Sequence, residues 1–302
     1  MAVVVFIFLF IFGLFTGSFL NLVSDRLPEK RKIVFGRSEC DFCHKTLGVK
    51  NLIPLFSFIF QKGRCSFCGR KLSYYYPFSE LLTGLVFMLA GYVSNFPYDL
   101  NAETAFVLFY YLVVFSFFVV MLLTDMKFYL ILDSLLVPAV LFVLFTSVIF
   151  RVLDLSNLYK SLSVDTFGSY LLKTDYFNNR IIYSLKDFGL VLLGASLISL
   201  FFLFLIFITK GRGMGFGDVK LGFLIGLVNG FPFGFTAIFT GFVLGAVYSV
   251  SLIFMKKKTM KDTIAFGPFL IMGSLLTFLF GQGLWDWYTQ IGSISSALGV
   301  GF

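Results

Sequence analysis

Four cysteines stand in two closely spaced pairs near the start of the chain. Cys40 and Cys43 form the first pair, Cys65 and Cys68 the second, and two residues separate the members of each pair. Each pair lies in a short turn-forming segment, where two thiolates can face one ion. Four thiolates complete the tetrahedral shell of a structural zinc ion and leave no open position for catalysis. The spacing therefore predicts a zinc site, with His44, the only histidine, as a solvated turn residue or a spare ligand.

Two aspartates at the ends of apolar runs form a second candidate site. Asp125 ends one run, and Asp218 follows Gly215-Phe216-Gly217 at the start of another. An ionisable group beside hydrocarbon is costly and is a functional hypothesis by default. Two carboxylates in one site share a proton, so the ionised one can activate water while the protonated one polarises a carbonyl. This is the chemistry of an aspartic protease, and the glycines would let a substrate strand approach the backbone closely.

Single acidic residues at helix ends also have simpler interpretations. Asp125 and Asp218 could each form a structural ion pair with a nearby lysine, such as Lys127 or Lys220. Asp133, about two turns into the next apolar run, is a further carboxylate near the first aspartate. Glu80 is interpreted as an acid in the first turn of a helix, where the helix dipole favours it.

The composition indicates whether the helices around these residues face water or lipid. Of 302 residues, 58% are hydrophobic and only 13% are charged, whereas soluble domains carry about 25% charged residues. So little polar surface excludes a soluble globule and a disordered chain, and four cysteines in 302 residues are too few for a secreted disulfide scaffold. The chain is predicted to be a polytopic membrane protein in a lipid bilayer. The net charge of +8 then reflects cytoplasmic loops, and we expect no nucleic-acid partner.

Eight apolar runs are candidate membrane spans, each judged against the roughly 20 residues that a spanning helix needs. They cover Val3–Val23, Pro77–Val93, Ala105–Thr124, Tyr129–Phe150, Phe188–Thr209, Leu221–Val228 with its neighbours, Phe235–Phe254 and Ile264–Leu284. The sixth is the weakest, because glycines interrupt it and Pro232 ends it. The predicted fold is all-α, with about eight transmembrane helices and a small cytoplasmic tetra-cysteine zinc module between the first and the second.

The distribution of basic residues predicts the orientation. If the eight spans alternate, 19 of the 24 Lys and Arg residues fall on one side, 11 of them within residues 24–76. The positive-inside rule then places the cysteines and both aspartates at the cytoplasmic face and the N-terminus outside. Because cytoplasmic thiols stay reduced, a disulfide or redox pair is a weaker alternative to zinc. We expect a membrane anchor over 1–23, the cysteine module over 24–76 and a membrane peptidase domain over 77–302, with an external loop over 151–187.

Several ordered motifs together resemble one known family. They are Gly17-Ser-Phe-Leu-Asn21 through Pro28, the paired cysteines, Tyr76-Pro-Phe-Ser-Glu80, Asp125 with Asp133, Gly215-Phe-Gly217-Asp218-Val-Lys220 and Phe266-Gly-Pro-Phe269. This set is similar to the type IV prepilin peptidases, bifunctional leader peptidase/N-methyltransferases of the membrane GxGD aspartic protease class. The chain departs from the family at Leu132, where proline usually precedes the second aspartate of the first motif.

The resemblance implies an activity and a set of site residues. Members of this family cut the short basic leader of prepilin or pseudopilin substrates at the cytoplasmic face of the inner membrane. They then transfer a methyl group from S-adenosylmethionine to the new N-terminus. By position, Asp125 and Asp218 would be the proteolytic pair, supported by Gly215, Gly217, Lys220 and Asp133, whereas Asn21 and Glu80 would serve methyl transfer. The chain shows no Rossmann pattern, so its methyltransferase activity and its S-adenosylmethionine rest on the resemblance alone.

Three other functions stay open at the level of the sequence. A peptidase of the same class could lack methylation. A transporter could use the two aspartates as a proton or cation relay, which would place them near the middle of the bilayer. An inactive zinc-module scaffold could dock pilus assembly proteins, although it would have no need to keep both aspartates.

Overall fold

The structure, a computed structural model, describes residues 1–33, 38–40, 42–164, 166–211, 214–257 and 264–297. Helices dominate these ranges, and two isolated bridges, Glu39 with Thr46 and Arg64 with Lys71, are the β pairings found there. Seven of the described helices are long and apolar enough to cross a membrane. The prediction of an all-α, multi-pass membrane protein is therefore confirmed.

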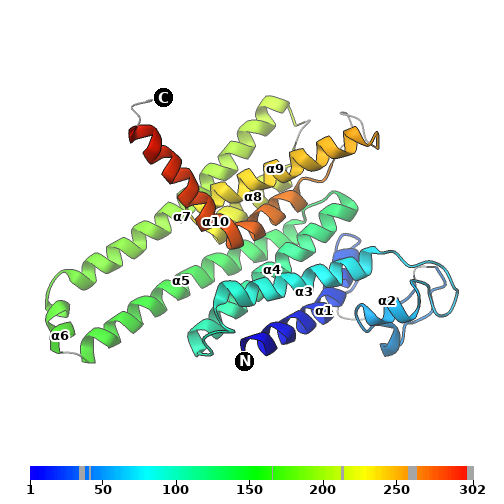
Figure 1. The fold of residues 1–302 in the computed structure, drawn as a ribbon, viewed down its shortest axis with the longest axis horizontal. Helices are drawn as coiled ribbons and strands as arrows, with labels where there is room; N and C mark the ends of the chain where they lie inside the picture. The colour runs from blue at the N-terminus through cyan, green and yellow to red at the C-terminus, as the bar shows by residue number, and fades with distance from the viewer. Residues whose placement is uncertain (34–37, 41, 165, 212–213, 258–263, 298–302) are drawn as a thin grey trace. The chain divides into compact units, whose positions relative to one another are not determined.

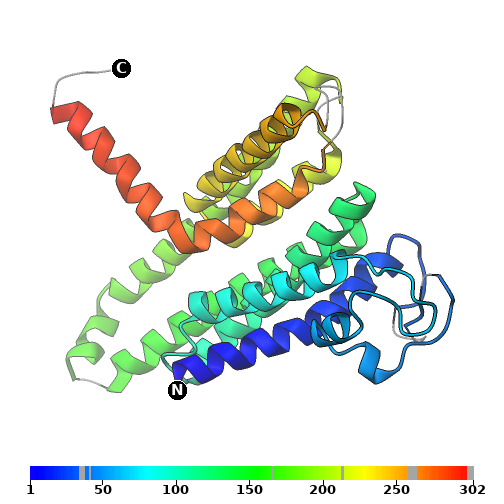
Figure 2. The same cartoon turned by 45° about the vertical axis from the view of Figure 1, so that its right-hand side comes forward.

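The chain divides into two compact units, residues 1–132 and 133–302. The first unit contains α1 (Ala2–Arg26), α3 (Tyr75–Ser94) and α4 (Ala102–Phe128), which run side by side in Figures 1 and 2. The cysteine segment joins α1 to α3 and includes a 3-10 turn, Val49–Asn51, and the short helix α2, Phe56–Phe60.

Small residues bring α1 and α3 into unusually close contact. A Cβ atom added to Gly13 would lie 2.7 Å from the Cα atom of Gly84, and one added to Gly17 would lie 3.0 Å from the Cα atom of Glu80. In a membrane, helix association depends on such close packing, because lipid is as apolar as the side chains. This contact fixes the positions of Asn21, one turn beyond Gly17, and of Glu80 on the facing helix.

The second unit contains α5 (Asp133–Val164), α6 (Thr166–Lys173), α7 (Tyr176–Thr209), α8 (Phe216–Asn229), α9 (Phe233–Phe254) and α10 (Gly267–Ala297). The weak sixth apolar run forms α8, whose 14 residues span about 21 Å, less than the roughly 30 Å hydrocarbon core. Glycines on α8 let α7 approach closely: a Cβ atom on Gly226 would lie 2.6 Å from the Cα atom of Ala195. A short helix enclosed by α7, α9 and α10 is a typical carrier for a polar site in a membrane protein.

Two local predictions need correction. Most of the segment 151–187, predicted as an external loop, is helical rather than irregular, because α5 runs on to Val164, α6 follows it and α7 begins at Tyr176 after a turn at 174–175. An ion pair of 2.8 Å between Arg151 and Asp187 joins the two extended helices, so their polar ends are paired with each other. Asp133, predicted inside a span, is instead the first residue of α5, where the positive end of the helix dipole favours a carboxylate.

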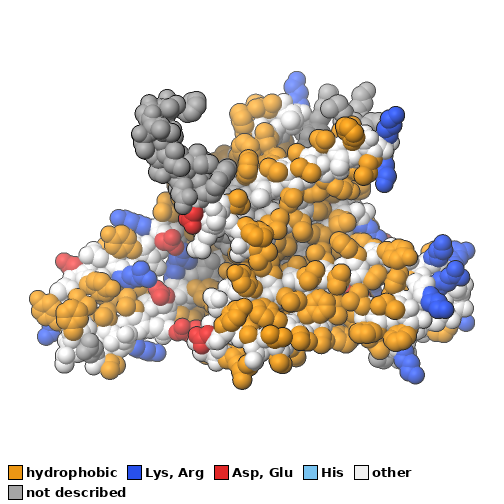
Figure 3. Space-filling model, in the orientation of Figure 1, with side chains coloured by type: hydrophobic (Ala, Val, Ile, Leu, Met, Phe, Trp, Pro, Cys, Tyr) orange, Lys and Arg blue, Asp and Glu red, His pale blue; other side chains and the backbone are white. Residues whose placement is uncertain are grey.

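The surface agrees with a membrane environment. Figure 3 shows hydrophobic side chains over most of the visible helical surface, whereas Lys and Arg side chains gather where the cysteine segment lies. Large apolar side chains such as Phe8 and Phe207 are 65% and 85% exposed. Exposure on this scale would cause aggregation in water and is expected of helices that face lipid.

The α9–α10 contact provides a prediction with a matched control on one helix. A Cβ atom on Gly273 would lie 2.5 Å from the backbone nitrogen of Gly241, whereas no described atom lies within 4 Å of a Cβ atom on Gly283. We expect Gly273→Ala to destabilise the protein by about 1–3 kcal/mol, the usual range for overpacking. Gly283→Ala should leave the stability nearly unchanged. Thermal unfolding of both variants in detergent measures the difference, and equal midpoints would contradict the close contact.

Candidate functional site

The four cysteines converge on one point. Their Sγ atoms all lie within 4.8 Å of one another, and those of Cys40 and Cys68 are 4.0 Å apart. A tetrahedral zinc ion with Zn–S bonds of about 2.3 Å sets its ligands about 3.8 Å apart, so the group fits such an ion with small adjustments. The predicted ligand set is thus brought together, and the four residues could hold a metal. His44 is exposed and lies outside this group.

Two matching turns hold the cysteine pairs. In the first, the Cys40 backbone nitrogen donates to the Lys45 carbonyl, and in the second the Cys65 nitrogen donates to the Arg70 carbonyl. The residue after each pair has a left-handed backbone, with φ of 53° at His44 and 68° at Gly69. This repeated geometry is typical of metal-binding turns, and the two turns are named the first and the second knuckle.

Side chains of the two knuckles also contact each other. The Lys45 ammonium lies 5.4 Å from the ring centre of Phe67, and the Arg70 guanidinium lies 4.9 Å from that of Phe42. Each knuckle thus supplies the cation for the aromatic ring of the other. Such cation–π contacts contribute about 0.5–1 kcal/mol each at exposed sites, so they hold the two knuckles together only weakly.

The local backbone adjusts the acidity of the thiols at the second knuckle. Backbone N–H groups of Cys68 and Phe67 point at the Cys65 sulfur and lower the pKa of that thiol to about 7. The Arg70 N–H lowers the pKa of the Cys68 thiol, but partial desolvation and the neighbouring thiols raise it further, to about 11. A divalent metal would replace these protons, since thiolates are its ligands.

A cavity of about 770 Å³ lies between the end of α1, the cysteine segment and the start of α3. Ser18, Asn21 and Glu80 line its helical part, while a basic stretch of Arg26, Lys30, Arg31 and Lys32 lines another part. The cavity also reaches Cys40 and Cys65, so the cysteine segment forms one of its walls. Its volume falls within the range of about 300–1,000 Å³ that small-molecule sites occupy. Asn21 and Glu80, both predicted for methyl transfer, therefore share one cavity.

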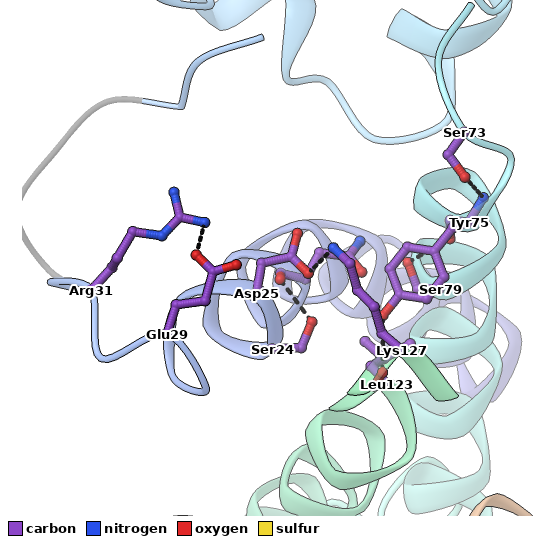
Figure 4. A network of polar contacts seen from close by, with 10 residues as sticks. Ser24, Asp25, Glu29, Arg31, Ser73, Tyr75, Ser79, Leu123 and Lys127 are labelled. Carbon is purple, nitrogen blue, oxygen red and sulfur yellow. Dashed lines mark hydrogen bonds and ion pairs between the residues drawn. The ribbon is translucent and has the colours of Figure 1, made fainter. Parts of the chain in front are cut away.

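Asp125 lies buried in the last turn of α4, with 6% of its surface exposed. The helix ends three residues later, where Tyr129 adopts a left-handed backbone and its nitrogen donates to the Asp125 carbonyl at 3.0 Å. This end of α4 meets the end of α1 and the start of α3, as the contacts in Figure 4 show. Asp125 is thus at the same end of the first unit as the cysteine segment.

Three contacts tie the last turn of α4 to the neighbouring helices (Figure 4). The Lys127 ammonium lies 2.7 Å from the Asp25 carboxylate on α1. The Tyr75 hydroxyl on α3 donates to the Leu123 carbonyl at 3.3 Å, and the Lys127 ammonium lies 5.8 Å from the Tyr75 ring centre. The lysine expected beside Asp125 therefore pairs with Asp25 instead, and the network fixes the turn that carries Asp125.

We expect the Asp25–Lys127 pair to act on Asp125 through its backbone. Asp25→Lys or Lys127→Asp alone should slow an activity that depends on Asp125 about two- to fivefold, the scale of a partly exposed ion pair. The double exchange should restore most of the rate, because it reverses the pair without removing it. Initial rates of the leader cleavage that the resemblance implies would measure this effect. A double variant no faster than the slower single variant would show that the pair does not position Asp125.

Asp218 lies in the first turn of α8, with 9% of its surface exposed. The Gly215 backbone nitrogen donates to its Oδ2 atom at 3.2 Å, which holds the carboxylate against the helix start. Gly215 itself has an ordinary extended backbone, and within the described part of the chain the atoms nearest to a Cβ atom placed on it lie 3.9 Å away. The fold thus does not require glycine there, and the open space beside Gly215 could receive a substrate strand. Gly217 is the second residue of α8.

Lys220 and Asp133 form an ion pair of 2.6 Å between α8 and the start of α5. The lysine expected beside Asp218 is therefore engaged by Asp133, which joins two of the predicted supporting residues. Asp125 belongs to the first unit and Asp218 to the second. That Asp125 and Asp218 act together as a catalytic pair stays a prediction.

Some residues at these sites were not singled out from the sequence. Asp25, Tyr75 and Leu55 contact partners that are far away along the chain, such as Lys127 for Asp25, 102 residues later. A charge next to the end of a span was the only available signal for Asp25. Leu55 gave no signal, because it acts through its backbone nitrogen.

Comparisons with known proteins identify the family. Residues 11–94 match the family described as Bacterial Peptidase A24 N-terminal domain. The chain is 31% identical to the prepilin leader peptidase/N-methyltransferase of Bacillus subtilis over 94% of its own length and 97% of the relative's. Proteins of the same name from Aeromonas salmonicida and Stutzerimonas stutzeri are each 27% identical, over 92% and 93% of this chain and 92% of theirs. No solved structure matches the chain.

Membrane-spanning helices, a tetra-cysteine group and buried aspartates at helix ends are together typical of a membrane enzyme. The similarity along nearly the whole chain makes the assignment specific. The chain belongs to the prepilin leader peptidase/N-methyltransferase family.

Proposed function

We propose that this protein cuts the short basic leader from prepilin or pseudopilin substrates at the cytoplasmic face of the inner membrane and then methylates the new N-terminus. The main support is the whole-length similarity to relatives that carry both activities in their name. It is strengthened by the placement of a buried Asp125 at the end of the first unit that also carries the basic cysteine segment. By the positive-inside rule that end faces the cytoplasm.

Cleavage is assigned to Asp125 and Asp218 acting together. Both are buried at helix ends, where a carboxylate can meet a peptide that approaches from the membrane face. Two such groups in one site hold a single proton. The ionised carboxylate takes a proton from water as that water attacks the scissile carbonyl, and the protonated one donates a hydrogen bond to the carbonyl oxygen. The Gly215 N–H and the Lys220–Asp133 pair keep the start of α8 in place.

The cysteine group is proposed to bind structural zinc. The convergence of four sulfurs and the paired knuckle turns support this assignment. Four thiolates fill the tetrahedral shell, so the ion supplies folding energy to the segment and takes no part in the reaction. Cys40 and Cys65 are buried and line the cavity, so the ion would hold the cysteine segment in place as one wall of the cavity.

Methylation is proposed to take place in the cavity that contains Asn21 and Glu80. S-adenosylmethionine would supply the methyl group, and its carboxylate is suited to the basic stretch of Arg26, Lys30 and Lys32 on the cavity wall. The cavity lies beside the end of α1 and the start of α3, where a newly cut N-terminus at the membrane face could enter.

One reaction tests the two activities together. The full chain in liposomes is incubated with a prepilin substrate, with and without S-adenosylmethionine, and the new N-terminus is determined by mass spectrometry. We expect a product that lacks the leader and, when S-adenosylmethionine is present, carries one more methyl group. Cleavage without an added methyl group would show that the protein is a peptidase without methyltransferase activity. A substrate that stays uncut would refute the proposed peptidase activity.

A further inference from the structure

The cavity is lined by an amide, that of Asn21, which has no hydrogen-bond partner among the residues that the structure describes. Asn21 is 4% exposed, and among the described residues neither its side-chain nitrogen nor its oxygen has a hydrogen-bond partner. Buried polar groups are nearly always hydrogen-bonded, so an orphaned amide lining a cavity needs an explanation. A ligand that occupies the cavity would provide the missing partner.

Glu80 lies on the helix packed against α1 and lines the same cavity. It is 8% exposed, and its Oε2 atom accepts a hydrogen bond of 2.9 Å from the Leu55 backbone nitrogen. Leu55 holds a left-handed backbone with φ of 59°, uncommon for leucine, to make this contact. Within the described part of the chain, Glu80 has no ion-pair partner, so a buried carboxylate retains acceptor capacity toward the cavity.

A carboxylate and an amide oxygen together are suited to a group with several N–H donors and a positive charge. A primary ammonium has three such donors. The basic stretch elsewhere on the cavity wall is suited to a ligand carboxylate instead, so the cavity has an acceptor part and a donor part. The acceptor part lies on α1 and α3, two of the seven described helices that are long and apolar enough to cross a membrane.

We propose that Glu80 and Asn21 bind the α-ammonium group of the cut substrate and that Glu80 takes a proton from it before methyl transfer. This inference rests on the proposed function. A cut substrate anchored in the bilayer reaches the cavity from the side of the helices, where these two residues lie. A soluble methyl donor reaches it from the side of the basic stretch.

The chemistry requires such a base. An ammonium nitrogen has no free electron pair, so it must first give one proton to the Glu80 carboxylate. The neutral amine then forms a bond to the methyl carbon of the donor, and the bond from that carbon to sulfur breaks with its electron pair left on sulfur. The products are a secondary ammonium, a neutral thioether and a protonated Glu80, which returns its proton to water.

Glu80→Gln tests the proposal with the full-length enzyme and a synthetic peptide that has the N-terminus of a cut substrate. We expect methyl transfer to slow at least about 100-fold, the usual contribution of a general base. Binding of S-adenosylhomocysteine and cleavage of uncut prepilin should stay within about twofold of wild type. Ser79→Ala is the matched control, because the buried Ser79 hydroxyl on the same helix bonds to its own helix backbone.

Asn21→Leu provides a second test that does not depend on Glu80. Because the amide has no partner in the described part of the protein, its removal should leave the melting temperature unchanged or higher, while the KM for the peptide rises about tenfold or more. A lower melting temperature with an unchanged KM would make Asn21 a structural residue and overturn its role.

The remaining outcomes separate this inference from the proposed function. If Glu80→Gln loses S-adenosylhomocysteine binding but keeps its KM for the peptide, Glu80 binds the ammonium of the donor and our assignment is wrong. If Glu80→Gln methylates at the wild-type rate, only the present inference fails. If wild-type enzyme cuts prepilin but methylates no peptide, the methyltransferase part of the proposed function fails as well.

Discussion

Asp125→Asn and Asp218→Asn are each expected to lower the rate of leader cleavage at least about 10³-fold. Asparagine keeps the shape of the side chain but can neither take a proton from water nor hold the shared proton of the pair. Both carboxylates are buried, at 6% and 9% exposure, so no neighbouring solvent ion can substitute for them. The initial rate of cleavage of a prepilin substrate in liposomes measures the loss.

The control for this prediction is a third aspartate on the same protein. Asp187 on α7 pairs with Arg151, is exposed and lies outside both proposed sites. Asp187→Asn should cleave at nearly the wild-type rate, and all three variants should reach the membrane in equal amounts. If either Asp125→Asn or Asp218→Asn retained near wild-type cleavage, the two-carboxylate mechanism would be wrong. Each variant should still methylate a peptide supplied already cut, because the cavity proposed for methyl transfer is lined by other residues.

Loss of the metal is expected to abolish methylation and to spare cleavage. Cys40→Ser or Cys65→Ser removes a buried ligand, and structural zinc contributes about 10–16 kcal/mol to the folding of small zinc domains. The loop between the knuckles supplies the Leu55 N–H that holds Glu80, so its disorder would release that carboxylate. We expect methyl transfer to fall at least about 100-fold, whereas Asp125 is held by contacts of α1 and α3 with α4.

Metal analysis and the two activities together test this prediction. Ser66→Ala, in the same knuckle but without a ligand atom in the cluster, is the control and should retain zinc and both activities. The zinc content should drop in the cysteine variants in step with methylation. A protein that methylates normally without zinc would show that the metal has no part in forming the cavity.

The sequence predicts most of the helical framework of this protein. Apolar runs long enough to span a bilayer leave little choice of structure, because backbone groups in lipid must bond within their own helix. The interrupted run near Gly222 and Gly226 indicated a weaker span, and it forms the 14-residue helix α8. The cysteine spacing likewise predicts a cluster, which the structure contains.

The sequence could not predict contacts between distant segments. The pairing of Asp25 with Lys127 and that of Leu55 with Glu80 depend on how α1, α3 and α4 pack, which no local pattern encodes. The helical extension of α5 beyond Arg151 was also missed. Its charged residues suggested a loop, whereas paired charges such as Arg180 with Asp154 lie between two helices.

The most direct test of the central claim asks whether Asp125 and Asp218 meet in one site. A double variant, Asp125→Cys with Asp218→Cys, is treated in its zinc-loaded form with a short bifunctional thiol reagent, with and without a bound leader peptide. Peptide mass spectrometry identifies the linked residues, and Asp125→Cys with Asp187→Cys is the control pair. We predict an intramolecular link between positions 125 and 218, at least when the peptide is bound, and none in the control. No link in either state, although each cysteine reacts singly, would contradict a shared catalytic site.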